Sequence, residues 1–223
     1  MEKTEDATVL PQPAQPSNSR GESLKQERAF RSRQQILSSA AAAFATGGYS
    51  SITIADVAQG AGMTKGAVYF HFANKEALAV AVCETFYDRW SRLYNEVVEL
   101  GLPPFDALLE FLRRTALLFK SDSTVQAGAR LQLEHETMGT QQILPAPFDT
   151  YHGLVVKLVA EAHKAGQLRP GSDPASLATV VTAAAFGAQH MSWVQCGWAD
   201  VLERMDQVIT ELVIPASSGA QNP

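Results

Sequence analysis

Apolar residues recur along most of this chain at the three- and four-residue spacing of one helix face, and strand-like alternation is nowhere convincing. The first such pattern covers about residues 25 to 47, where the Gly47-Gly48 pair is typical of a helix end. Its apolar positions are Phe30, Ile36, Leu37, Ala40, Ala41 and Phe44. The pattern predicts a first helix that buries this face.

Two short helices are predicted after it. Thr53 is followed three residues later by Asp56, a capping-box spacing with Asp in place of the usual Glu or Gln, and the segment closes near residues 60–62. Thr64 can cap the next helix, in which Val68 and Phe72 share a face. We interpret Phe70 and Phe72 as core aromatics.

A longer helix is predicted from Asn74, and its apolar stripe runs through Leu78, Val82, Phe86, Trp90 and Leu93. Further helical patterns cover about 105–120, 122–137, 147–165, 174–194 and 199–213. Residues 180–188 are almost all small and apolar, which fits a helix that is buried on all sides or packed against its own copy. The expected fold is all-α, with about nine helices.

Composition narrows the class of protein. The chain has 223 residues, of which 46% are hydrophobic and 18% charged, enough for a sizeable core. Cys83 and Cys196 lie far apart, which argues against a disulfide framework or a zinc site and favours a reducing cytoplasm. Long apolar spans and a signal-peptide pattern are missing, so we expect a cytoplasmic protein without membrane spans.

Domain boundaries follow from the same patterns. Residues 1–22 are rich in Pro and small polar residues and are expected to form a disordered arm. We expect a small helical domain over 23–75, a larger one over 76–215 and a disordered tail over 216–223.

Charge is distributed unevenly between these parts. Six basic and two acidic residues give the segment 24–75 a net charge of +4, so the rest of the chain carries −9 of the total of −5. A basic segment followed by an acidic one suggests that only the first meets a polyanion, although a solvated surface would show the same balance.

The two short helices joined by a glycine-containing turn form a helix-turn-helix pattern, which can place the start of its second helix in the major groove of DNA. Thr64, Lys65 and Gly66 occupy that start, and a lysine there can reach guanine O6 or N7. The residues expected to contact the phosphate backbone are Tyr69, His71, Thr53, Lys75, Arg31 and Arg33.

The segments 48–58 and 61–78, which include Thr64-Lys65-Gly66 and Tyr69-Phe70-His71-Phe72, resemble the DNA-binding domain of TetR-family repressors. The resemblance covers about residues 28–80. It implies a homodimer that binds double-stranded operator DNA at a palindrome and leaves it when a small molecule enters the C-terminal domain. We expect dimerisation through about 174–213, with ligand entry swinging the long helix that starts near Asn74.

A narrower resemblance concerns the second domain. The stretch 125–131 and the Pro147-Phe148 pair, together with 65–72, resemble the actinobacterial γ-butyrolactone receptors, which sense lactone, butenolide or furan signals that switch on antibiotic production. Many members of that branch carry tryptophan three residues after the Pro-Phe pair, where this chain has Tyr151. By the same comparison Tyr87 and Gln132 match polar pocket positions of the furan-sensing members.

A pocket for a small hydrophobic signalling molecule needs apolar walls with a few convergent polar groups. The candidate donors are Tyr87, Gln132 and Tyr151, and the candidate walls are Trp90, Phe119, Leu133, Phe148 and Trp193. No cofactor is expected beyond this small-molecule effector.

An enzyme is disfavoured because the chain has no metal-binding histidine pair, phosphate loop or nucleophile elbow, and because Glu134, His135 and Glu136 diverge around a helix. A TetR-like regulator of an efflux or metabolic gene that responds to a lipophilic drug or metabolite remains an alternative, as does a pseudo-receptor that has lost its signal.

Overall fold

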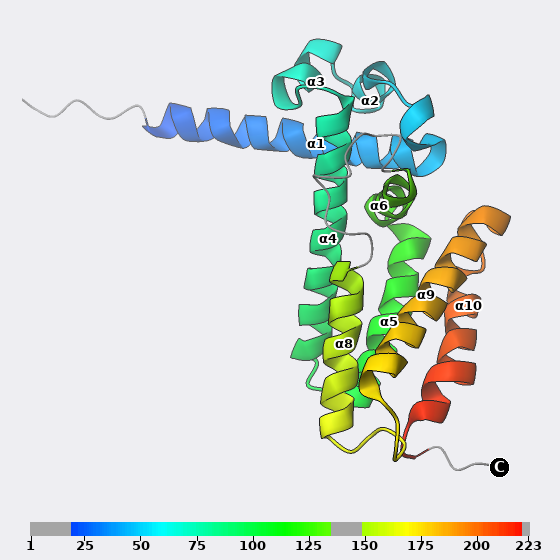
Figure 1. Cartoon of the computed structure of the whole chain (residues 1–223). Helices are drawn as coiled ribbons and strands as arrows, with labels where there is room; N and C mark the ends of the chain where they lie inside the picture. The colour runs from blue at the N-terminus through cyan, green and yellow to red at the C-terminus, as the bar shows by residue number, and fades with distance from the viewer. Residues whose placement is uncertain (1–18, 135–148, 220–223) are drawn as a thin grey trace, which may run out of the picture.

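The computed structural model describes residues 19–134 and 149–219, and these ranges hold nine α-helices (Figure 1). The helices are α1 (Ser19–Ser51), α2 (Ile54–Gly60), α3 (Lys65–His71), α4 (Lys75–Glu99), α5 (Pro104–Ser121), α6 (Ser123–Leu133), α8 (Asp149–Lys164), α9 (Pro174–Cys196) and α10 (Val201–Val208). A π-helical turn (Ile209–Val213) and a 3-10 turn (Ile214–Ala216) extend α10. The predicted all-α fold is confirmed.

The predicted N-caps start three of these helices. Thr53 accepts from the Asp56 N–H (3.3 Å) and donates its own N–H to the Asp56 carboxylate (2.8 Å), which completes the capping box of α2. These bonds from Thr53 lower the pKa of Asp56. Thr64 caps α3 by accepting from the Ala67 N–H, and Asn74 caps α4 by accepting from the Ala77 N–H.

Helix α1 differs from its prediction at both ends. It starts at Ser19, inside the range expected to be disordered, and its first half projects away from the rest of the described chain (Figure 1). At the other end Gly48, with φ 74°, interrupts the helix before its last turn. Phe30 was expected on the buried face but is 63% exposed, because it lies on the projecting half of α1, which no other described helix covers.

Two apolar cores share the long helix α4. Leu78 and Val82 belong to the core formed with α1, α2 and α3, while Phe86 and Trp90 belong to the core formed with α5, α8, α9 and α10. Helix α6 is also divided in this way, because Ala127 and Leu131 join the first core while Val125 and Ala129 join the second. Both helices therefore connect the small N-terminal bundle to the larger bundle.

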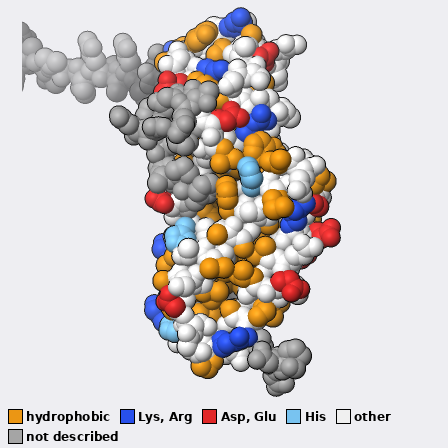
Figure 2. Space-filling model, turned by 45° about the vertical axis from the view of Figure 1, so that its right-hand side comes forward, with side chains coloured by type: hydrophobic (Ala, Val, Ile, Leu, Met, Phe, Trp, Pro, Cys, Tyr) orange, Lys and Arg blue, Asp and Glu red, His pale blue; other side chains and the backbone are white. Residues whose placement is uncertain are grey.

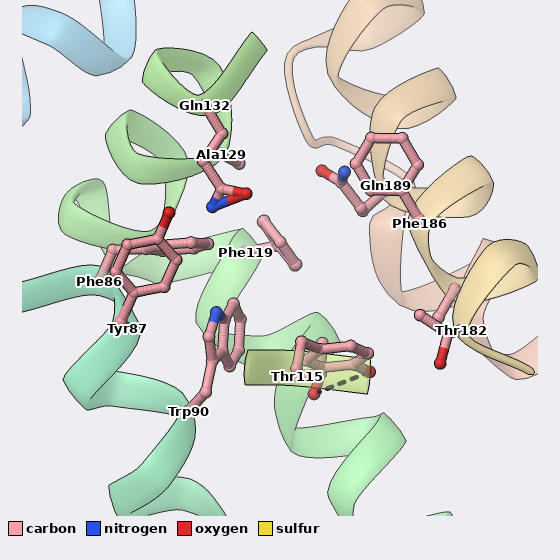
Figure 3. A pocket seen from close by; sticks show the side chains of 12 residues that line it. Phe86, Tyr87, Trp90, Thr115, Phe119, Ala129, Gln132, Thr182, Phe186 and Gln189 are labelled. Carbon is pink, nitrogen blue, oxygen red and sulfur yellow. Dashed lines mark hydrogen bonds between the residues drawn. The ribbon is translucent and has the colours of Figure 1, made fainter. Parts of the chain in front are cut away.

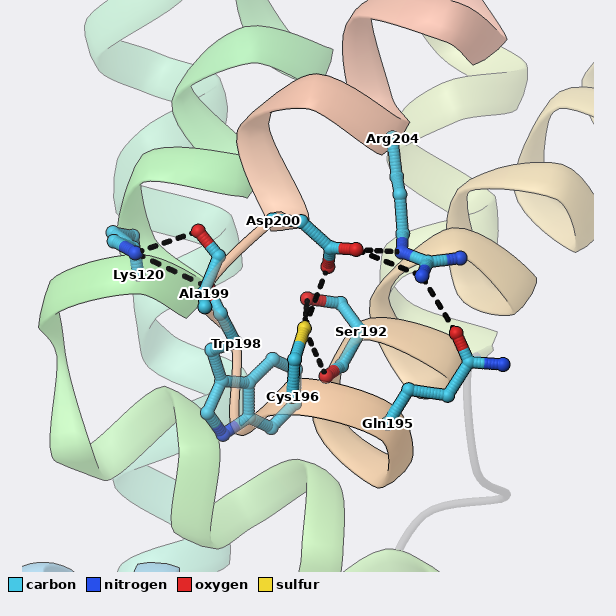
Figure 4. A network of polar contacts seen from close by, with 8 residues as sticks. All are labelled: Lys120, Ser192, Gln195, Cys196, Trp198, Ala199, Asp200 and Arg204. Atoms are coloured by element: carbon cyan, nitrogen blue, oxygen red, sulfur yellow. Dashed lines mark hydrogen bonds and ion pairs between the residues drawn. The ribbon is translucent and has the colours of Figure 1, made fainter.

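The corner between α9 and α10 is fixed by a polar network (Figure 4). The Asp200 carboxylate accepts from the Arg204 Nε (2.8 Å) and the Cys196 thiol (3.0 Å), and these bonds, that from Arg204 first, hold the pKa of Asp200 well below its usual range. Lys120 of α5 donates to the Ala199 carbonyl (2.8 Å). Trp198 stacks on Phe119 with ring centroids 5.0 Å apart, so the corner is anchored to α5.

Within the described ranges, no helix combines the length and the apolar character that a membrane crossing requires. Over the same residues, no cluster of three or more His, Cys, Asp or Glu side chains is arranged to hold a metal ion.

Candidate nucleic-acid interface and ligand pocket

Helices α2 and α3 form the helix-turn-helix at one end of the molecule (Figure 1). Of the residues of α3, only Val68 is buried. Val68 is buried and holds α3 on the core, whereas Lys65 and Gly66 at the helix start are exposed. Tyr69 is 53% exposed on the same helix. The structure therefore brings the residues predicted to face the major groove onto one open surface.

The interpretation of Phe70 as a core residue is wrong. Phe72 is buried as expected, but Phe70 is 79% exposed. Residues two apart on a helix lie about 200° apart around its axis, so Phe70 cannot share the buried face of Val68 and Phe72. Its ring meets His71 edge-on, with centroids 5.0 Å apart. An exposed phenylalanine thus stands on the outer face of α3.

The residues predicted to contact phosphates surround this helix in different settings. Thr53 is exposed, and His71 is half-buried. Arg31 is exposed and forms an ion pair with Glu27 on its own helix (2.5 Å). Arg33 lies over the Phe72 ring, 5.0 Å from its centroid. Their contacts with DNA stay predictions.

Lys75 has a second role inside the protein. Its ammonium donates to the carbonyls of Tyr49 (2.9 Å) and Ile52 (3.0 Å), and it lies 4.2 Å from the centre of the Tyr49 ring. These contacts fix the start of α4 to the segment that joins α1 to α2. A lysine has three donors, so one remains for a phosphate.

Helix α6 holds the neighbouring part of α1. Arg130 donates to the Thr46 carbonyl (2.7 Å) and forms an ion pair with Glu134 (3.0 Å). Glu134 in turn accepts from the Tyr49 N–H (2.6 Å). We call residues 45–52 the α1–α2 corner; it is held by side chains from both α4 and α6.

A pocket of about 490 Å³, including its open mouth, lies in the larger bundle between α4, α5, α6, α8 and α9 (Figure 3). Glycine at position 128 lets α6 come close to α4, because a Cβ there would collide with the Phe86 side chain. The lining residues are Phe86, Tyr87, Trp90, Thr115, Phe119, Ala129, Gln132, Tyr151, Thr182, Ala185, Phe186 and Gln189.

The polar groups of the pocket are neutral. Burial raises the pKa of Tyr151 to about 12, although its hydrogen bond to the Thr115 hydroxyl (3.5 Å) acts in the opposite direction. Burial also raises the pKa of Tyr87. Both hydroxyls therefore stay protonated at neutral pH and can donate hydrogen bonds to a bound molecule.

Five of the predicted pocket residues line this cavity, namely Tyr87, Trp90, Phe119, Gln132 and Tyr151. Two others do not. Leu133 is exposed, because it follows Gln132 by about 100° around α6, and Trp193 lies outside the lining, where Arg130 packs over its ring (5.5 Å). Phe148 and His135 fall outside the described residues.

Part of the pocket wall was not predicted from the sequence. Thr182, Phe186 and Gln189 all lie on α9, within or next to the apolar run that predicted only burial or self-association. Their four- and three-residue spacing places them on one helix face. That spacing is the one signal by which a pocket-facing stripe on α9 could have been found.

This helical architecture is similar to that of known regulatory proteins. Residues 36–82 match the family described as "Bacterial regulatory proteins, tetR family". The A-factor receptor protein of Streptomyces griseus is 30% identical over 177 residues, which cover 79% of this chain but only 60% of that relative.

Two solved structures are similar to this chain in both sequence and fold. One, described as the molecular basis for control of antibiotic production by bacterial hormones, is 42% identical with a TM-score of 0.77 and covers 84% of this chain and 97% of its own. The other is CprB from Streptomyces coelicolor in complex with its biological operator sequence, which is 29% identical with a TM-score of 0.62 over 72% of this chain and 78% of its own. The chain belongs to the TetR family, and it is therefore a DNA-binding transcriptional regulator and not an enzyme.

Proposed function

We propose that this chain is a ligand-responsive repressor that binds a palindromic operator as a homodimer in the cytoplasm. A small diffusible signal of the γ-butyrolactone, butenolide or furan type releases it and so controls antibiotic production. The observation that carries the proposal is that α4 begins at the helix-turn-helix and, further along, lines an amphiphilic pocket. Similarity to the A-factor receptor protein, and to the structure described as the molecular basis for control of antibiotic production by bacterial hormones, supports the signal class.

In this proposal residues 23–75 bind DNA and residues 76–215 bind the effector and the second chain. Lys65 reads a base edge while Thr64 and Gly66 let α3 approach closely. The exposed or half-exposed polar residues around α3 position it on the backbone: Arg31, Arg33, Thr53, Tyr69, His71 and Lys75.

The surface over α9 and α10 supports the homodimer. Figure 2 shows apolar side chains gathered down this face of the molecule. Val180, Met191 and Val194 of α9 and Leu202 of α10 are exposed there, and Val194 is 66% exposed. Contiguous apolar surface of this kind marks a protein–protein interface. A two-fold axis here would set two copies of α3 about 34–36 Å apart, the spacing of successive major grooves.

Release follows from the way the pocket is connected to the DNA-binding end. Helices α4 and α6 both line the pocket, and both hold the α1–α2 corner through Lys75, Arg130 and Glu134. A molecule that fits better when α4 and α6 are displaced shifts the corner, and the two α3 helices lose register with the grooves.

A panel titration tests the proposal. The full chain is mixed with a γ-butyrolactone, a butenolide, a furan carboxylate and a cationic dye, and thermal stability and operator binding are measured for each. A cognate compound should raise the melting temperature and release the operator. Release by the cationic dye alone would favour a drug-responsive regulator, and no release by any compound would contradict the proposed signal class.

A further inference from the structure

Gln189 of α9 is a buried polar residue that faces the pocket. It is 4% exposed, and its Oε1 has no hydrogen-bond partner among the described residues. The Tyr87 hydroxyl, on α4, is likewise buried and has no hydrogen-bond partner among the residues that the structure describes. A buried polar atom without a partner destabilises the folded protein. Both groups are explained if a bound molecule supplies the missing partners.

These two groups lie near one end of the pocket. In Figure 3 the amide of Gln189 extends from α9 toward the region where the Gln132 amide and the Tyr87 hydroxyl lie, while Trp90 and Thr115 stand at the opposite end. Polar tips from α4, α6 and α9 thus lie at the end nearer to α1. The rest of the wall is aromatic and aliphatic apart from three hydroxyl groups, and two of these, on Tyr151 and Thr115, are bonded to each other. A molecule that fits has a polar head and an apolar body.

We propose that Gln189 recognises the head group of the effector. Its amide oxygen accepts a hydrogen bond from a hydroxyl or N–H of that head, while the Tyr87 hydroxyl donates to a carbonyl or carboxylate oxygen of the same head. The inference rests on the proposed effector function of the pocket. None of the described lining residues is charged, so the head is held by hydrogen bonds to neutral groups.

Such a head group bridges two helices with different tasks. Gln189 lies on α9, which carries the proposed dimer surface, and Tyr87 lies on α4, which begins at the helix-turn-helix. A molecule bonded to both sets the distance between α9 and α4. An analogue without the hydroxyl or N–H fills the pocket but loses this link, so it binds more weakly and releases DNA less well.

Gln189→Met tests the assignment, because methionine has a similar length and no polar group. The matched control is Gln195→Met on the same helix, where the glutamine is exposed and accepts from Arg204 (2.7 Å). Without any probe, the melting temperature of full-length Gln189→Met should equal or exceed that of wild type, since an unpartnered buried amide has been removed. A clear fall would show that the amide supports the fold and would overturn the proposal.

Two probes are compared by calorimetry: a γ-butyrolactone with a hydroxymethyl group on its ring, and the same lactone with methyl in that place. Wild type and Gln195→Met should prefer the hydroxymethyl probe, and Gln189→Met should bind it about tenfold or more weakly and lose the preference. A matching pair of furan carboxylates is run in parallel. The proposal would be overturned if Gln189→Met kept the preference. It would also be overturned if the wild-type protein distinguished the members of neither pair, or bound none of the four probes.

Operator release separates this inference from the proposed function. Suppose that the hydroxymethyl probe binds the wild-type pocket and that Gln189→Met weakens its binding, but that the operator stays bound throughout. The recognition by Gln189 then stands, and the proposed repressor mechanism fails.

Discussion

Lys65 is the side chain of α3 best placed to distinguish bases, since it is exposed at the helix start that Thr64 caps. We expect Lys65→Ala to weaken operator binding by about 1–3 kcal/mol and to relax the preference at one base pair, because a cation–guanine contact is lost. Tyr69→Phe should instead weaken binding to all operator sequences by the same factor. Fluorescence anisotropy with singly substituted operators measures both effects.

The control for Lys65 is Lys164→Ala, which removes an equally positive residue from the surface of α8, where it pairs only with Glu161 among the described residues. Operator affinity and base preference that are unchanged in Lys65→Ala would show that α3 is docked differently from the proposal.

Tyr151 lies in the pocket wall, where its hydroxyl is one of the candidate donors to the effector. Tyr151→Phe keeps the ring among Trp90 and Phe111 but deletes the hydroxyl that contacts Thr115. We expect DNA binding to stay intact, while the effector concentration needed for release rises about fivefold, as the loss of one hydrogen bond implies. Release titrations on wild type and variant measure this. Identical titrations would exclude the hydroxyl from recognition.

Single residues also show how far sequence reasoning reaches. The caps at Thr53, Thr64 and Asn74 were predictable, because capping is local: the cap side chain accepts a hydrogen bond from the backbone N–H of a residue three positions later. The pocket role of Gln189 was not, because an amide inside an apolar helix gives no sign of whether its partner is another residue or a ligand. That distinction depends on tertiary packing.

Among the helices, we propose that α4 and α6 transmit the state of the pocket to the α1–α2 corner. Arg130→Met removes the donor to Thr46 and the partner of Glu134. We expect the variant to bind effector normally. The ratio of operator affinity without effector to operator affinity with effector should fall at least fivefold, which is within the usual range of coupling energies. Titrations of operator at zero and saturating effector give this ratio.

Arg113→Met is the control for this experiment, because Arg113 is exposed on α5, away from the corner. A ratio in Arg130→Met that equals the wild-type ratio would mean that α6 carries none of the signal and that α4 alone connects the two ends.

The elements themselves were largely predictable from the sequence, and their exceptions have physical causes. Helical spacing placed α4, α5 and α9 to within a few residues, since each buries a regular face. The start of α1 could not be placed, because its first half is mostly exposed and so lacks an apolar period. The contacts of α6 with α1 join residues about 85 positions apart, and no local pattern encodes such pairs.

In the whole molecule, operator binding by the proposed mechanism requires two chains. Val194→Asp places a charge in the exposed apolar face of α9. We expect it to give monomers and to lower operator affinity by at least tenfold, because each α3 then binds one half-site alone. Sedimentation velocity and anisotropy measure the two effects. Dimers of unchanged stability would place the interface elsewhere.

Effector-controlled binding of a palindrome by two chains can be measured by selecting duplexes from a random pool with the full chain, and repeating the selection with the probe that most raises its melting temperature. We expect that an inverted repeat is enriched, that two chains bind it, and that saturating probe abolishes the enrichment. Enrichment of a single half-site bound by one chain, or of a palindrome that stays bound when the pocket is filled, would contradict the proposed mechanism.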